Sequence, residues 1–390
     1  MTGAPALGRV QSPTGDGVAE LHLPPIVHFG RGALTRLGPE ARGFGARALV
    51  VTDRGMVASG IVDQVTQVLR DAGVEPVVFD RVEPNPTIAE VDAGLEAGAG
   101  MGIALIVSVG GGSAHDCAKT IALVATNGGD ARDLEGVDRS PHSGLPLICV
   151  NTTAGSGADV SRYAVITDPT RSIKMIIIDR HLMPRVAIND PLLTVGMPAA
   201  VTMASGLDAL THAIEAYVST LASELSSLFA LRAGELVVAD LERAVRDGSD
   251  VDAREGMLMG SLLAGLAIDS ASVGAVHAMA HQLGAVYDLP HGVCNGILLP
   301  LVVEFNEPAA SARYDRFAAV FGGGATARRL PSLLRSLGDR VGLPRGLSAL
   351  GVERSRLPEL ASRAMTDMCM DTNPRPMAEA DVVRLYERAL

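Results

Sequence analysis

IALIVSVGGGSAHDCAK, residues 103–119, decides the fold of this 390-residue chain. Its first seven residues predict a buried strand, which runs into three glycines: Gly110, Gly111 and Gly112. Backbone amides at such a turn can approach an anion, and a helix N-terminus adds partial positive charge. We expect Ser113 to cap the helix and Asp116 to lie in its first turn. A tight turn without a ligand would leave the same pattern.

Strand-like and helical runs alternate from about residue 21 to residue 192. The other clear strands are ALVVTD (48–53), PVVFD (76–80), PLICV (146–150) and MIIID (175–179). Helical patterns such as VDQVTQVLRDAG (62–73) and IAEVDAGLEAG (88–98) separate them. Buried apolar strands alternating with helices predict a parallel sheet covered on both faces.

Strand patterns end near residue 193, and helical periodicity follows. The expected helices are 198–218, 222–246, 251–268, 271–285, 311–321, 326–341 and 378–389. The sequence therefore predicts a flexible tail (1–20), an α/β domain (21–192) and an all-helical domain (193–390).

Composition narrows the class of protein. A net charge of −11 argues against nucleic acid or anionic membranes as partners. No run approaches 18 strongly apolar residues, and the N-terminus lacks the pattern of a secretory signal. The cysteines are far apart, which fits a reducing cytoplasm: Cys117, Cys149, Cys294 and Cys369. The 47% hydrophobic content suggests a homodimer or a larger homo-oligomer.

Four residues in the second half are spaced like the ligands of one metal ion. Asp208 and His212 lie one turn apart on a predicted helix, SGLDALTHAIEAYVS. His277 and His291 bracket VHAMAHQLGAVYDLPHG, the first on a helix and the second after a proline-led loop. One carboxylate and three imidazoles suit a divalent transition metal such as iron or zinc. The alternative is that these side chains lie at the surface or in the core and bind no metal.

Other polar residues follow strand ends. No acid that ends a predicted strand lies about twenty residues after the glycines, where a Rossmann fingerprint places a ribose-binding acid. Asp53, after an upstream strand, could instead bind the adenosine ribose and repel the 2′-phosphate of NADP, although an acid there is also common turn chemistry. Thr152 and Thr153, after PLICV, suit hydrogen bonds to a phosphate or a carboxamide. Only two of the 33 basic residues are lysines, Lys119 and Lys174.

From about residue 24 onward the chain resembles the iron-containing, or group III, alcohol dehydrogenases. This family includes NAD-dependent methanol and 1,3-propanediol dehydrogenases. The resemblance rests on EPNPT, GGGSAHDCAK, NTTAGSGADVS, GLDALTHAIEAYVS, HAMAHQLGAVYDLPHGVCN and DTNPRP, in that order. It implies a Rossmann-like N-terminal domain that binds the dinucleotide and a helical C-terminal domain that binds metal, with the active site in the cleft between them.

The resemblance also implies roles for particular residues. The metal ligands would be Asp208, His212, His277 and His291, and His281 would relay a proton. NAD would contact Asp53, Asn85, Gly110, Gly111, Gly112, Ser113, Thr152, Thr153, Ser161 and Lys174. Two residues depart from the family pattern. Asp159 replaces a longer acid, and Ile268 stands where a Phe often narrows the substrate entrance, which predicts a wider substrate pocket.

The expected function is reversible hydride transfer between NAD and a small primary alcohol or aldehyde, assisted by Fe²⁺ or by Zn²⁺ or another divalent ion. A hydroxy-acid or semialdehyde dehydrogenase, acting on substrates such as 4-hydroxybutyrate, is the alternative, with Arg162 and Arg375 as candidate carboxylate partners. A carbon–oxygen lyase like dehydroquinate synthase would need a Glu ligand and a cluster of basic residues. The scarcity of lysine argues against it.

Overall fold

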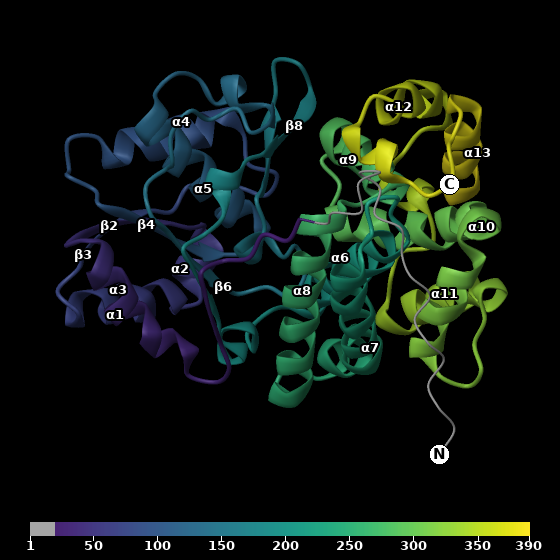
Figure 1. The fold of residues 1–390 in the computed structure, drawn as a ribbon, viewed down its shortest axis with the longest axis horizontal. Helices are drawn as coiled ribbons and strands as arrows, with labels where there is room; N and C mark the ends of the chain where they lie inside the picture. The colour runs from purple at the N-terminus through teal and green to yellow at the C-terminus, as the bar shows by residue number, and fades with distance from the viewer. Residues whose placement is uncertain (1–19) are drawn as a thin grey trace.

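The computed structural model describes residues 20–390 and contains a mixed α/β part and a helical part side by side (Figure 1). The predicted tail, residues 1–20, lies outside the described residues except for Glu20. Every strand ends by Asn189, and the long helices begin at Ala199. The composition shift near residue 190 therefore marks a real change of architecture, while the division into two domains stays a prediction.

The main sheet has six strands, all parallel, as the sequence predicts. Their order is β1 (Ile26–Phe29), β9 (Val186–Asn189), β6 (Leu147–Asn151), β4 (Leu105–Gly110), β2 (Arg47–Val51) and β3 (Glu75–Phe79). Alternate residues of each central strand enter two different cores, because successive side chains point to opposite faces. One core includes residues of α1 (Leu37–Phe44) and α3 (Ile61–Asp71), and the other residues of α4 (Ile88–Gly98) and α5 (Gly112–Asn127).

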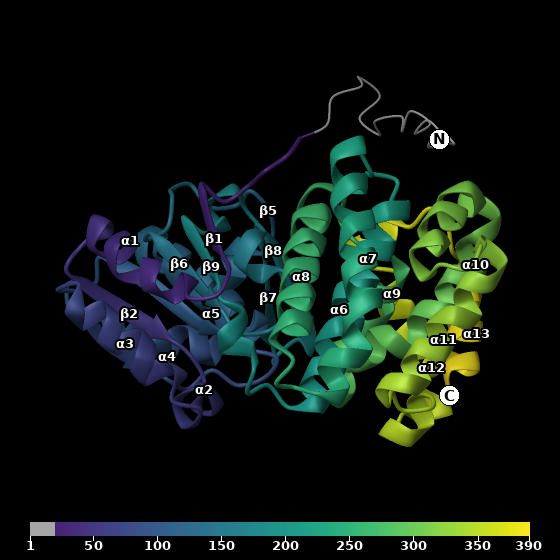
Figure 2. The same ribbon diagram turned by 90° about the horizontal axis from the view of Figure 1, so that it is seen from below.

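The placement of MIIID in the parallel sheet is wrong. It lies in β8 (Ile173–Ile178), which pairs antiparallel with β7 (Tyr163–Asp168) and parallel with β5 (Gly136–Val137) in a separate small sheet. Only residues 169–172 join β7 to β8, and a parallel pairing needs a crossover of a dozen or more residues. Figure 2 shows this small sheet between the main sheet and α8 (Val251–Ala271).

The helical part positions the candidate metal ligands. Its helices are α6 (Ala199–Val218), α7 (Glu224–Arg246), α8, α9 (Ala275–Tyr287), α10 (His291–Ala318), α11 (Leu330–Val341), α12 (Leu357–Ala364) and α13 (Glu379–Ala389). The first half of α10 was not expected, because Pro300 and Pro308 interrupt its pattern. The helix is not regular throughout, since Ala310 has a non-helical backbone.

α6 lies at the centre of this part and is buried along most of its length. It packs against α7, α8 and α10, so side chains on several of its faces are enclosed. Within residues 20–390 no single helix has the length and apolar character needed to cross a membrane. α8 and α9 pass that test only as a pair bent by 104°.

Candidate active site

The glycine turn joins β4 to α5 as predicted, but its capping differs. Gly111 is the N-cap of α5 and no side chain caps the helix, so the prediction that Ser113 is the cap is wrong. The helix begins at Gly112, which places Asp116 in the second turn rather than the first. Gly111 leaves no room for a side chain, since a Cβ there would lie 2.8 Å from the Thr153 side chain. This close contact fixes the glycine turn against the loop that contains Thr153.

Asp116 instead faces the cleft, where its carboxylate accepts a hydrogen bond from the Val165 amide (3.1 Å). Burial raises the pKa of its carboxyl from 3.8 to about 6, while Lys119 and Lys174 act in the opposite direction. Lys119 itself is buried and donates to the carbonyl oxygens of Ser161 and Tyr163, both at 2.7 Å. Lys119 therefore holds the backbone at the start of β7 in place.

Asp116→Asn is expected to make stability less dependent on pH. An acid with a higher pKa in the folded state makes stability fall as pH rises, here between about 4 and about 6. Denaturant unfolding at about pH 4 and about pH 8 should show a decline that is smaller in the variant by at most about 3 kcal/mol. Asn can still accept the hydrogen bond from the Val165 amide, so the variant removes the charge and keeps this contact. If the free energy of unfolding declined equally in both proteins, burial of the Asp116 carboxylate would not be what makes stability fall as pH rises.

Besides Gly111, the predicted cofactor residues fall into two groups. The first lies at the carboxyl ends of the neighbouring strands β2, β4 and β6, the usual edge for a nucleotide. Asp53 caps the N-terminus of α2 (Arg54–Ala58), accepting from Met56 N at 2.9 Å. A Cβ on Gly110 would lie 3.5 Å from Asp53 Oδ2, and the Thr152 amide donates to Gly110 O. These contacts bring three predicted cofactor residues close together: Asp53, Gly110 and Thr152.

The second group lines a cavity of about 380 Å³ between the sheet edge and the helical part. From the predicted cofactor residues it contains Asn85, Gly112, Ser113, Thr153, Ser161 and Lys174. The same cavity is lined by Asp208, His212, His277, His281, His291 and Ile268. Residues separated by more than 200 positions therefore share one cleft.

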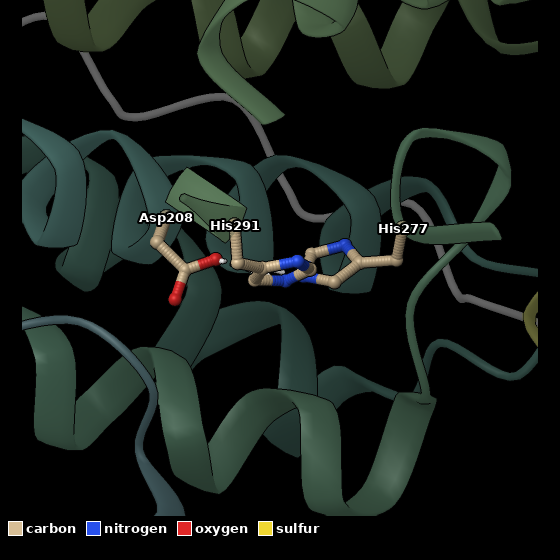
Figure 3. Close-up of side chains that lie close together, drawn as sticks. All are labelled: Asp208, His277 and His291. Atoms are coloured by element: carbon tan, nitrogen blue, oxygen red, sulfur yellow. Dashed lines mark ion pairs between the residues drawn. The ribbon is translucent and has the colours of Figure 1, made fainter. Parts of the chain in front are cut away.

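Three of the four candidate metal ligands form a group with metal-ligand spacing, namely Asp208, His277 and His291, and His212 lies near Asp208 but outside that group. Asp208 Oδ1 lies 3.9 Å from His212 Nε2, 3.7 Å from His277 Nε2 and 3.5 Å from His291 Nε2. Asp208 and His212 come from α6, His277 from α9, and His291 from the first position of α10. Figure 3 shows Asp208, His277 and His291 meeting from these separate segments.

These separations fit a bound metal ion. Ligands on a tetrahedral ion with bonds of about 2.1 Å lie ~3.4 Å apart, close to the observed values. The Asn295 amide supports the fit, because its Nδ2 lies 2.7 Å from Asp208 Oδ1, 3.1 Å from His291 Nε2 and 3.3 Å from His277 Nε2. Asn295 Nδ2 therefore lies among the side-chain atoms that would ligate the ion.

Electrostatics favours the ligand form in three of the four candidates. Burial opposes ionisation of Asp208, yet the neighbouring imidazoles hold the pKa of its carboxyl well below its usual range. Burial also lowers the pKa of His212 to about 4 and that of His291 well below 6.5, so both rings are neutral. His277 differs, because Asp208 and Glu215 outweigh burial and raise its pKa to about 9.

Two residues that support the ligands were missed from the sequence. Glu215 Oε2 lies 2.5 Å from His277 Nδ1, and its Oε1 accepts from the Val276 amide. This contact leaves His277 Nε2 directed at Asp208. The available signal was spacing, since Glu215 lies one turn after His212 and Asn295 one turn after His291.

His281, the expected proton relay, lies in the same cavity beside the ligands. Its ring stacks on that of His291, with centroids 5.4 Å apart, and its Nδ1 lies 2.9 Å from Asp367 Oδ2. His281, Asp367 and Cys369 also form a group with metal-ligand spacing, but the Asp367 contact already engages His281 Nδ1. His281 Nε2 is left for the cavity.

Neither arginine of the hydroxy-acid alternative lines the cavity. Arg162 forms an ion pair with buried Asp269 at 3.0 Å and also donates to the Asp269 carbonyl. Arg375 donates to Phe305 O and stacks on the Phe305 ring. Arg162 pairs across 107 positions of sequence, which local patterns could not reveal. Ile268 does line the cavity, as expected.

A nucleotide-binding sheet edge that faces a carboxylate–imidazole cluster is the arrangement of an oxidoreductase that combines a dinucleotide with a metal ion. Comparison with known proteins gives the particular family. The family model described as "Iron-containing alcohol dehydrogenase" matches residues 24–191, and "Fe-containing alcohol dehydrogenase family, C-terminal" matches residues 202–390. The chain belongs to the iron-containing alcohol dehydrogenase family.

Named relatives cover almost the whole chain. Alcohol dehydrogenase 4 of Saccharomyces cerevisiae is 43% identical over 376 residues, covering 95% of this chain and 98% of the relative. The NAD-dependent methanol dehydrogenase of Bacillus methanolicus is 38% identical, covering 94% and 99%. A crystal structure of 1,3-propanediol oxidoreductase matches with a TM-score of 0.93 at 39% identity, covering 96% of this chain and all of that one. The expected fold class is confirmed.

Proposed function

We propose that this alcohol dehydrogenase moves a hydride reversibly between NAD and a small primary alcohol or aldehyde at a metal centre, with Fe²⁺ as the first candidate. The observation that carries the proposal is the convergence of three imidazole Nε2 atoms on Asp208 Oδ1, inside the cavity that also contains the nucleotide-side residues. Iron in the family description and NAD in the name of one relative support the choice of metal and cofactor.

Each part of the cavity has a proposed task. Asp208, His212, His277 and His291 would hold the metal, and the glycine turn with Asp53, Thr152, Thr153, Ser161 and Lys174 would hold NAD. When bound, the metal would lower the pKa of the substrate hydroxyl and NAD would accept the hydride. The chain itself must then remove the hydroxyl proton. His281 is placed for this step, because Asp367 fixes its Nδ1 and leaves Nε2 to exchange protons at the cavity.

The lining of the cavity favours a small uncharged alcohol over a hydroxy acid. Its surface is mainly apolar, and Lys174 is the one Lys or Arg side chain among its described lining residues. Lys174 is engaged with Asn85 at 2.5 Å. Ile268 in place of a ring leaves room for an alkyl chain longer than that of methanol. We therefore place the preferred substrates among short unbranched alcohols and diols.

The first test is NADH formation from a series of short alcohols by protein that is chelated and then reloaded with Fe²⁺ or Zn²⁺. Turnover lost on chelation and restored by metal would support the proposal. Comparing butanol with 4-hydroxybutyrate tests the class of substrate. Faster turnover of 4-hydroxybutyrate would favour the hydroxy-acid reading, and absence of turnover with every metal, despite NAD binding, would contradict the dehydrogenase assignment.

Asp53→Ser is expected to weaken the discrimination against NADP. The Asp53 carboxylate lies beside Gly110 at the strand ends, where it would hydrogen-bond the ribose hydroxyls and repel a 2′-phosphate. Ser still caps α2, so the fold should be kept. The ratio of kcat/KM for NADP to that for NAD should rise by about tenfold or more, which corresponds to roughly 1.4 kcal/mol. An unchanged ratio would place the ribose elsewhere.

Assembly and location also remain proposals. We propose a homodimer or larger homo-oligomer in the cytoplasm. Exposed apolar side chains at and before the edge strand β1 support self-association: Leu23, Ile26 and Val27. All four cysteines are free and buried, as suits a reducing compartment. Light scattering of the purified protein would measure the assembly.

A further inference from the structure

Asp288, which ends α9, reaches across the cleft to the nucleotide side. Its Oδ1 accepts a hydrogen bond from Asn85 Nδ2 at 2.6 Å, and 203 positions of sequence separate the two residues. Asn85 lies in the loop between β3 and α4, whereas Asp288 precedes the metal-ligand candidate His291 by three positions. The contact therefore joins the two walls of the cavity.

Lys174 fixes the direction of this contact. Its Nζ lies 2.5 Å from Asn85 Oδ1, and β8, which carries it, lies beside α9 (Figure 1). An ammonium only donates and a carboxylate only accepts, so the Asn85 amide must turn its oxygen to Lys174 and its nitrogen to Asp288. A Cβ on Gly284 of α9 would lie 3.0 Å from Lys174 Nζ, so the lysine is closely packed there.

Both partners have backbones that L-residues rarely adopt. Among the described non-glycine residues only five have positive φ, and two of them are Asn85 (φ 56°) and Asp288 (φ 53°). Asn and Asp tolerate this left-handed region better than other side chains, so these residue types suit the contact. Strained backbones gather where the surrounding structure and function require them. The left-handed backbone of Asp288 ends α9, and together with that of Asn85 it sets the geometry in which the two side chains meet.

We propose that the Asn85–Asp288 hydrogen bond is a latch across the cleft that slows release of the dinucleotide, with Asp288 as its positioning residue. The inference rests on the proposed NAD-dependent function. Asn85 and Lys174 line the cavity and Asp288 does not, so Asp288 acts on the cofactor through Asn85. The bond is exposed at the edge of the cleft, where it can break and re-form as the cofactor passes.

The test compares Asp288→Gly with Asp288→Asn in the metal-loaded protein. Gly accepts φ of +53° without strain but removes the hydrogen-bond acceptor, whereas Asn keeps both an acceptor oxygen and the tolerance of left-handed φ. Release of NADH is followed by stopped-flow displacement with excess NAD. The dihydronicotinamide ring of NADH fluoresces and the oxidised ring of NAD does not, so the fluorescence reports the release.

We expect Asp288→Gly to release NADH about three- to tenfold faster than the parent protein, as loss of one exposed charge-assisted hydrogen bond implies. Asp288→Asn keeps a neutral acceptor and should release NADH more slowly than Asp288→Gly. Equal release rates in the two variants would overturn the latch alone. Failure of the parent protein to bind NADH would overturn the proposed function and the latch with it.

Discussion

Asp208→Asn is expected to lower kcat/KM for alcohol oxidation by at least ~10³-fold while NAD still binds. Asp208 Oδ1 is the atom on which all three imidazole Nε2 atoms converge, at 3.5–3.9 Å. Asn keeps the size of the side chain and removes its negative charge. A neutral amide binds a transition-metal ion much more weakly than a carboxylate, so the variant should be purified with little metal.

Metal content by mass spectrometry, NADH formation and NAD binding must be measured together on this variant. The matched control is Glu215→Gln, which alters the partner of His277 without touching a ligand atom. Loss of such a partner costs about 10- to 100-fold in metal affinity, so added metal should restore this control. Full activity of metal-free Asp208→Asn would refute the ligand assignment, and loss of NAD binding would show a general structural defect.

The candidate site could be predicted largely because its signals are local. Asp208 and His212 lie one helical turn apart, and that spacing survives in α6 regardless of how the rest of the chain folds. The glycine turn is equally local, since three glycines between an apolar strand and a helix leave few other structures. Such patterns located the cavity, although the assigned roles of its residues remain proposals.

The differences between the predictions and the structure come largely from contacts that are distant in sequence. Arg162 is a candidate partner of a substrate carboxylate by sequence, and in the structure it pairs with Asp269, 107 positions away on α8. Proline usually ends a helix, yet Pro300 lies inside α10. β8 has the composition of a parallel strand, and only the short link to β7 decides that it folds back. Asp288 lies within a recognised motif, but its role is found only through its contact with Asn85, 203 positions away.

Gly292→Ala is expected to release the metal and destabilise the fold, although Gly292 is not a candidate ligand. α10 begins against α6 at this point, and a Cβ on Gly292 would lie 2.0 Å from the Ala204 carbonyl oxygen and 3.2 Å from Asp208 Cβ. The carbonyl belongs to a helix backbone and cannot turn away. The start of α10 must therefore shift, and it carries His291.

The shift should pull His291 Nε2 away from its position 3.5 Å from Asp208 Oδ1. We expect at least ~100-fold weaker metal binding and a loss of about 1–3 kcal/mol in the free energy of unfolding, as overpacking usually costs. The matched control is Gly43→Ala on the exposed face of α1, where a Cβ meets nothing within 4 Å. Ala there should be neutral or stabilise by up to about 1 kcal/mol. Metal affinity can be measured by competition with a chelator. Since the clash at Gly292→Ala cannot be avoided, an affinity equal to that of the parent protein would show that α10 can move without displacing His291.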